Sequence, residues 1–166
     1  MRFFLVDRLL QIEKGKSLVA AKCVAMSEDY FTDHFPGFPV MPGSLILEGF
    51  EQASHLLIGI SSDFTRAASL RRITRGSFRH LVRPGDRLVL RVSLTRFGET
   101  EAYVLAAAEA EGKKIADARL EFELTSAPHD PEAAGRCRRL QEFYQLLTVD
   151  PAHVAGESWG QQLGAG

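Results

Sequence analysis

A histidine and a glutamate lie at either side of a proline- and glycine-rich segment in residues 34–52, which read HFPGFPVMPGSLILEGFEQ. His34 carries an imidazole, and an unperturbed pKa of about 6.5 suits that ring to take up a proton near neutral pH. Glu48 carries a carboxyl group that can act as an acid if it stays protonated. Proline restricts φ and glycine permits conformations that other residues resist, so one fixed backbone path is predicted between the two groups.

A third chemical group is expected at the start of the helix that contains Glu48. Pro42 suits the first turn of a helix, where its missing N–H would have no partner, and Gly43 follows it. The N–H groups of a first turn are unpaired donors at the positive end of the helix dipole. A base, an acid and such a donor are what is needed to remove a proton beside a carbonyl and expel a leaving group.

Each of these residues also has a structural interpretation. His34 is explained equally well as a loop residue that caps a backbone group. Glu48, Glu51, Gln52 and His55 fall on one helical face, which is typical of a solvated stripe. Glu51 either raises the pKa of Glu48 or faces solvent, and we expect solvent. His55 pairs with Glu51 at i,i+4 spacing, and we expect a structural role for it.

The elements that must position these groups follow from the hydrophobic pattern. A long, largely apolar helix is predicted over residues 43–60. Strands are predicted in six runs: residues 2–12, 17–26, 70–82, 87–97, 102–110 and 115–124. Leu88, Leu90 and Val92 alternate with Val89, Arg91 and Ser93, the period-2 pattern of a sheet packed on one face. The predicted fold class is α+β, with one central helix wrapped by a curved antiparallel sheet.

The chain after residue 126 has a different character. Asp130 and Pro131 form a typical helix start, with Asp130 as the cap. Apolar residues then recur at helical spacing, which predicts an amphipathic helix over about residues 131–148 followed by a loose end. We therefore divide the chain into a domain of residues 1–126 and an extension of residues 127–166.

Composition limits the classes of function. The chain has 166 residues, 45% of them hydrophobic, and a net charge of −1. This balance gives no electrostatic reason to expect nucleic acid or an anionic membrane as a partner. Cys23 and Cys137 fit no metal-ligand spacing, and no apolar run approaches the roughly 20 residues that cross a bilayer. We expect a cytoplasmic protein without a signal peptide, metal or membrane span.

The segment of residues 34–52 resembles the signature of the FabZ/FabA-type β-hydroxyacyl-thioester dehydratases, which have the hot-dog fold. The resemblance extends to residues 4–8 and 76–90 and covers roughly residues 3–125. It implies a homodimer with shared active sites, or a trimer of such dimers, with the histidine and the acid supplied by different subunits. It assigns the catalytic roles to His34 and Glu48. It assigns oxyanion or substrate contacts to six residues: Gly43, Gln52, Phe38, Met41, Pro42 and Phe78.

The implied reaction removes water from a 3-hydroxyacyl thioester and yields a trans-2-enoyl thioester. His34 takes the C2 proton, the Gly43 N–H stabilises the thioester oxygen, and Glu48 protonates the leaving hydroxyl. Apolar neighbours of Glu48 are expected to keep it protonated, namely Leu45, Leu47 and Phe50. Glutamate at position 48, where dehydratase/isomerases carry aspartate, favours a plain dehydratase. The resemblance implies no cofactor, because the acyl chain is carried on the phosphopantetheine of acyl carrier protein or on coenzyme A.

Two alternatives remain open for the activity: a thioesterase, and an acyl-binding hot-dog subunit without turnover. Two residue groups also have two interpretations each. The first group either lines an acyl tunnel or packs in the core: Phe31, Phe35, Phe38 and Phe78. The second group either docks an acidic carrier protein or is a solvated basic face, and we favour the solvated face: Arg71, Arg72, Arg75, Arg79 and Arg83.

Overall fold

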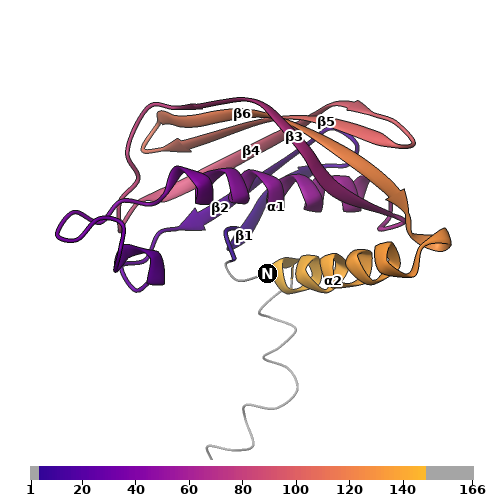
Figure 1. Ribbon diagram of the computed structural model, residues 1–166, viewed down its shortest axis with the longest axis horizontal. Coiled ribbons are helices and arrows are strands. Elements are labelled where there is room, and N and C mark those ends of the chain that lie inside the picture. The colour runs from indigo at the N-terminus through magenta and orange to yellow at the C-terminus, as the bar shows by residue number, and fades with distance from the viewer. Residues whose placement is uncertain (1–3, 149–166) are drawn as a thin grey trace, which may run out of the picture.

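The computed structural model describes residues 4–148 and has one six-stranded sheet and two long helices. Its elements in chain order are β1 (Arg8–Glu13), β2 (Ser17–Cys23), η1 (Asp29–Phe31), α1 (Gly43–Ser61), β3 (Arg66–Phe78), β4 (Arg87–Phe97), β5 (Glu101–Ala110), β6 (Lys113–Ser126), η2 (Ala127–His129) and α2 (Pro131–Thr148). The sheet arches over α1, and α2 lies on the other side of α1 (Figure 1). The predicted α+β class, with a helix wrapped by a curved sheet, is confirmed.

The strands follow the order β1-β2-β4-β5-β6-β3, and each neighbouring pair is antiparallel. Hairpins join β1 to β2, β4 to β5 and β5 to β6, whereas α1 separates β2 from β3 along the chain. This places β3 at one edge of the sheet. Within the described residues β3 pairs with β6 on one side and with no strand on the other.

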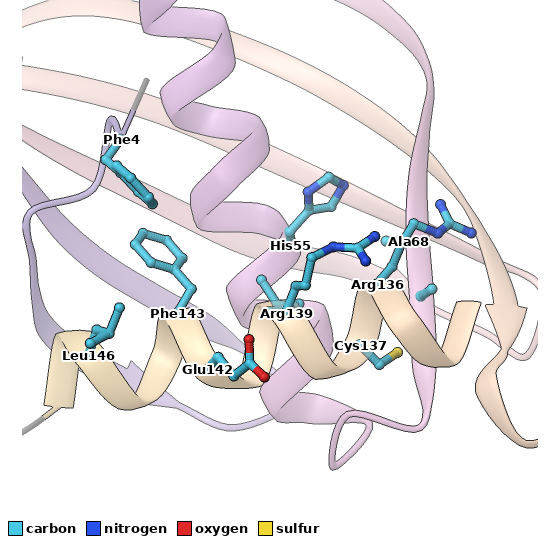
Figure 2. Close-up of a pocket in the computed structure, with 11 residues that line it drawn as sticks. Phe4, His55, Ala68, Arg136, Cys137, Arg139, Glu142, Phe143 and Leu146 are labelled. Carbon is cyan, nitrogen blue, oxygen red and sulfur yellow. The ribbon is translucent and has the colours of Figure 1, made fainter. Parts of the chain in front are cut away.

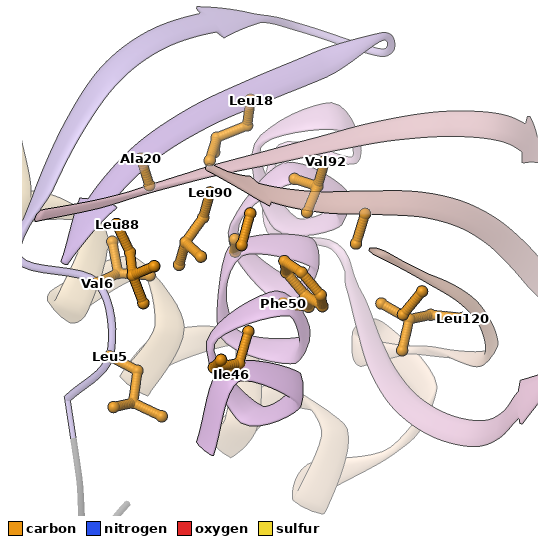
Figure 3. Packing of buried hydrophobic residues seen from close by; sticks show 14 of the residues in the cluster. Leu5, Val6, Leu18, Ala20, Ile46, Phe50, Leu88, Leu90, Val92 and Leu120 are labelled. Carbon is orange, nitrogen blue, oxygen red and sulfur yellow. The ribbon is translucent and has the colours of Figure 1, made fainter. Parts of the chain in front are cut away.

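The core lies between the concave face of the sheet and α1. Leu88, Leu90 and Val92 of β4 are buried, as their alternation predicts. Phe50 and Ile46 project from α1 toward them (Figure 3). Burial of such side chains contributes about 1.5–3 kcal/mol each, so this layer is a main source of the stability that holds α1 in place.

The alanine-rich strand β5 shows tertiary context overriding helix propensity. Its inward residues, Ala102, Ala106 and Ala108, are buried, and β5 pairs with β4 and β6 along its length. Small side chains on the inner face let α1 approach the centre of the sheet closely. The strand assigned to residues 102–110 is therefore confirmed.

Several predicted strands have different bounds in the structure, and two of the differences bear on the loop before α1 and on the edge of the sheet. In the described part of the run of residues 2–12, from Phe4 onward, the strand begins only at Arg8, although Leu5 and Val6 before it are buried. The run of residues 70–82 is β3, which starts at Arg66 and ends at Phe78. The end differs because the Val82 carbonyl accepts a hydrogen bond from the Met41 N–H at 2.8 Å. The Arg79 N–H still donates to the Ile115 carbonyl of β6 at 2.8 Å, and beyond it the chain leaves the sheet and contacts the loop before α1.

Helix α2 matches the predicted helix of residues 131–148. Asp130 caps it, because its Oδ1 accepts hydrogen bonds from the N–H groups of Glu132 and Ala133 at 2.8 and 3.1 Å. Cys137 and Phe143 are buried against the rest of the fold. The predicted loose end lies outside the described residues. No helix within residues 4–148 is long and apolar enough to span a bilayer.

Candidate active site

The loop before α1 fixes the ring of His34. Its Nδ1 lies 2.8 Å from the Val40 carbonyl oxygen, and backbone hydrogen bonds join Val40 N–H to the His34 carbonyl and His34 N–H to the Tyr30 carbonyl. A carbonyl only accepts, so Nδ1 carries the proton in the neutral ring. Nε2 is then the unprotonated nitrogen, and the half-buried His34 can accept a proton at that atom.

Glu48 is held by a buried amide one turn further along α1. Gln52 is 2% exposed; its Nε2 donates to Glu48 Oε1 at 2.9 Å, and its Oε1 accepts from the Leu5 N–H at 2.9 Å. The two contacts determine which way the amide points, because the backbone N–H can only donate. This connection fixes Glu48 relative to the segment that precedes β1.

The Gln52 amide is expected to contribute measurably to stability. Gln52→Leu removes the acceptor of the buried Leu5 N–H, so the free energy of unfolding should fall by about 1–3 kcal/mol. Urea unfolding measures this, with Gln141→Leu on the exposed face of α2 as the control. Equal stability of the Gln52→Leu and Gln141→Leu proteins would show that the connection is unimportant.

Gly43 is the first residue of α1 and lies against Phe78 at the end of β3. A Cβ at Gly43 would come within 3.0 Å of the Phe78 ring, so glycine is what allows this approach. The Gly43 N–H makes no hydrogen bond within residues 4–148, as expected for a first-turn donor. An unpaired donor therefore lies beside an aromatic ring at the helix start.

The other predicted contact residues occupy different environments. Met41 is buried in the core, and Pro42 caps α1. Phe38 is exposed and carries the Arg83 guanidinium 4.4 Å above its ring. Phe50 was expected beside Glu48. Helix residues that are two positions apart in the sequence point in directions about 200° apart, however, and Phe50 points into the core instead.

The four phenylalanines with two interpretations fall into two groups, one buried residue and three exposed ones. Phe31 is a core residue, as the packing interpretation predicts. Phe35, Phe38 and Phe78 are 54%, 45% and 49% exposed. These three therefore form an apolar surface around the loop and the start of α1, and they are available to a substrate or a second subunit.

Within residues 4–148 His34 and Glu48 share no hydrogen bond or ion pair. His34 contacts Val40 and stacks on Phe35 with ring centroids 4.2 Å apart, whereas Glu48 contacts Gln52. The chain thus holds an imidazole, a carboxyl group and an unpaired amide N–H without joining His34 to Glu48.

Glu51 does not face solvent as expected. Its side chain is 25% exposed, and burial, followed by the nearby charge of Glu48, raises its pKa. Glu51 Oε1 lies 3.8 Å from His55 Nε2. The two side chains predicted to pair at i,i+4 spacing therefore lie close together, at a distance longer than a hydrogen bond.

His55 should make the protein sensitive to acid. Burial, followed by Arg136, lowers its pKa to about 4. Between pH 6.5 and 4 the unfolded chain therefore binds more protons, and the free energy of unfolding should fall by about 2–3 kcal/mol as the pH decreases through this window. His55→Gln should remove that part of the pH dependence.

Urea unfolding at several pH values between 7 and 4 tests this expectation. His80→Gln is the matched control, because His80 is exposed. If His55→Gln and the unsubstituted protein lose stability equally in acid, another group is responsible.

A cavity of about 420 Å³ between α1, β3 and α2 was not predicted from the sequence. His55, which is twelve residues after Gly43 on α1, and Arg136 of α2 line it. The only signal in the sequence was the pair of arginines at 136 and 139, spaced to lie on one face of the predicted helix.

Comparison with known proteins places this geometry in a family context. Residues 1–119 match the FabA-like domain family. A 3-hydroxyacyl-[acyl-carrier-protein] dehydratase FabZ from Pediococcus pentosaceus is 42% identical over 118 residues, which cover 70% of this chain and 79% of that protein. The FabZ of Bacillus velezensis is 37% identical over 123 residues, covering 74% and 87%. Helix α2 lies beyond the matched family region.

Solved structures show the same fold at low identity. The acetyl-CoA-bound protein smu.793 from Streptococcus mutans UA159 has a TM-score of 0.61 and 20% identity, covering 76% of this chain and 94% of its own. The dehydratase heterocomplex ApeI:P from Xenorhabdus doucetiae has a TM-score of 0.53 and 15% identity, covering 69% and 96%. These likenesses agree with the hot-dog fold.

Proposed function

The chain belongs to the FabA-like family, and on this premise we propose that it is a dehydratase that converts 3-hydroxyacyl thioesters into trans-2-enoyl thioesters in acyl-chain biosynthesis. The observation that carries the proposal is the Nδ1 contact of His34 with the Val40 carbonyl. That contact leaves Nε2 free to act as a base. The ring lies in the loop that leads into α1.

The reaction can be written with three groups of this chain. His34 Nε2 takes the proton from C2, and the electrons of that C–H bond form the C2–C3 double bond. The C3–O bond breaks, and Glu48 donates a proton so that the hydroxyl leaves as water. The Gly43 N–H stabilises the negative charge on the thioester oxygen, a contribution of roughly 3–4 kcal/mol for one such donor. No step requires a cofactor or a metal.

The active enzyme is a homodimer in this proposal, because one chain does not join His34 to Glu48. The unpaired edge of β3 supports a second copy: it is 13 residues long and includes the exposed Ile73. Pairing of two such edges would bring the His34 loop of one subunit toward α1 of the other. A trimer of dimers is the larger alternative.

An acyl carrier protein is the proposed donor of the substrate, with coenzyme A as the alternative carrier. Arg83 lies over Phe38 beside the catalytic loop, where an acidic carrier would approach. Arg72 and Arg79 are engaged with Glu121 and Asp117, so they carry less free charge than the sequence suggests. Cys23 and Cys137 are free thiols, which agrees with a protein that functions in the reducing cytoplasm.

A single assay separates the proposed activities. With crotonyl thioester the dehydratase should run in reverse, and hydration should remove the enoyl absorbance without releasing thiol. Release of free thiol would instead identify a thioesterase. If neither occurs on coenzyme A or acyl carrier protein over a range of chain lengths, an acyl-binding subunit without turnover replaces the proposed enzyme.

A further inference from the structure

The cavity between α1, β3 and α2 has the composition of a ligand site. Apolar side chains from both ends of the described chain form one wall, among them Phe4, Phe143 and Leu146. The rings of Phe4 and Phe143 lie 5.2 Å apart between centroids, facing each other in Figure 2. A volume of about 420 Å³ is in the usual range for small-molecule sites, about 300–1,000 Å³.

Arg136 forms the polar part of the cavity. Its Nη1 donates to Ser69 Oγ at 2.5 Å, but its Nε is buried and makes no hydrogen bond in the described part of the chain. A buried donor without an acceptor destabilises the folded state, and a charged one does so more. The guanidinium therefore has hydrogen-bonding capacity that the described part of the chain does not use.

The charges around the cavity favour an anion. Arg139 also lines it, and Glu142 is the carboxylate among the lining residues. Figure 2 shows Arg136 and Arg139 projecting from α2 on the side that carries His55. The Nε2 of His55 is buried without a hydrogen bond, 3.8 Å from Glu51, and this ring is neutral near pH 7. Two cations therefore face one anion at the lining.

We propose that this cavity binds a monocarboxylate with an unbranched apolar chain, a fatty acid in chemical class, with its carboxylate on Arg136. A planar guanidinium matches the geometry of a carboxylate and strengthens its hydrogen bonds by charge. The chain lies against the apolar wall that Phe4, Phe143 and Leu146 form, where its burial is favourable. The site depends on α2, so it goes beyond the catalytic groups on the loop and α1.

Calorimetric titration of the full chain with octanoate, and with octan-1-ol as the uncharged equivalent, tests the proposal. Octanoate should bind more tightly than the alcohol. Arg136→Gln should weaken octanoate binding by about tenfold or more and leave octan-1-ol binding unchanged. Arg138→Gln is the matched control, because Arg138 is exposed on the same helix and does not line the cavity.

A second variant keeps the test independent of folding. Leu146 lines the cavity but is 73% exposed, so Leu146→Glu places a negative charge at its rim with little effect on the core. It should weaken octanoate binding as well, and thermal unfolding checks that each variant is folded.

Three results overturn the proposal: no saturable octanoate binding, equal affinity for octan-1-ol, or equal losses in Arg136→Gln and Arg138→Gln. If a second subunit fills the cavity, the titration gives the first of these results, no saturable octanoate binding. The titration requires no turnover, so it is independent of the proposed reaction.

Discussion

His34→Ala is expected to lower the turnover of a 3-hydroxyacyl thioester by roughly 10²–10⁴-fold, the usual contribution of a positioned general base. The substitution removes the nitrogen that takes the C2 proton, and no other imidazole replaces it in the loop. The fold should persist, because His34 is half-buried and lies outside the core cluster. Hydration of crotonyl thioester, followed by absorbance, measures the loss.

His34→Asn separates the chemical role of the ring from its role in the loop. The asparagine amide can still donate to the Val40 carbonyl, the contact that His34 Nδ1 makes at 2.8 Å. It cannot act as a base. Both variants should therefore be inactive, and the asparagine variant should be the more stable of the two in thermal unfolding. Activity in either protein near that of the unsubstituted chain would remove His34 from the mechanism.

The fold was largely predictable because its signals are local. The alternation at Leu88, Leu90 and Val92 and the apolar run of α1 both reflect one buried face, and both were confirmed. The bounds of β3 were not predictable in the same way. They depend on the hydrogen bond between Met41 and Val82, which joins residues 41 positions apart. Periodicity carries no information about such a partner.

In the candidate site, likewise, local features were predictable from the sequence and tertiary contacts were not. His34, Glu48 and Gly43 were identified from residue type and spacing. In the structure the ring of His34 contacts the Val40 carbonyl and Glu48 contacts Gln52, and the catalytic roles of the three residues stay predictions. The role of Leu5 as the partner of Gln52, 47 residues away, had no signal in the sequence. The burial of Glu51 likewise depends on tertiary packing, which spacing along one helix does not show.

Helix α1 thus carries groups of interest in both of its halves. Its first half holds Gly43 and Glu48, whose surroundings end in an incomplete site within one chain. Its second half holds His55, which α2 and β3 enclose in a cavity. A substitution in the first half should change turnover, whereas one in the second half should change stability in acid. The two halves can therefore be tested separately.

Glu48→Gln should lower turnover by roughly 10²–10⁴-fold with little change in stability. The new amide keeps an oxygen for the Gln52 Nε2 donor, so the connection through Gln52 to Leu5 remains, but it has no acidic proton for the leaving hydroxyl. The same crotonyl thioester assay measures the effect, and Glu142→Gln on the exposed surface of α2 is the control. Unchanged turnover in Glu48→Gln would assign the acid to another residue.

Mixing the two inactive proteins tests where the sites lie. If His34 of one subunit acts with Glu48 of the other, a mixed dimer of His34→Ala and Glu48→Gln subunits has one intact site and one doubly altered site. Random exchange should then restore about one quarter of the full activity, because half of the dimers are mixed. Sites contained within one subunit would stay inactive in every combination. Mixing after partial unfolding and refolding, with each variant refolded alone as the control, distinguishes these outcomes.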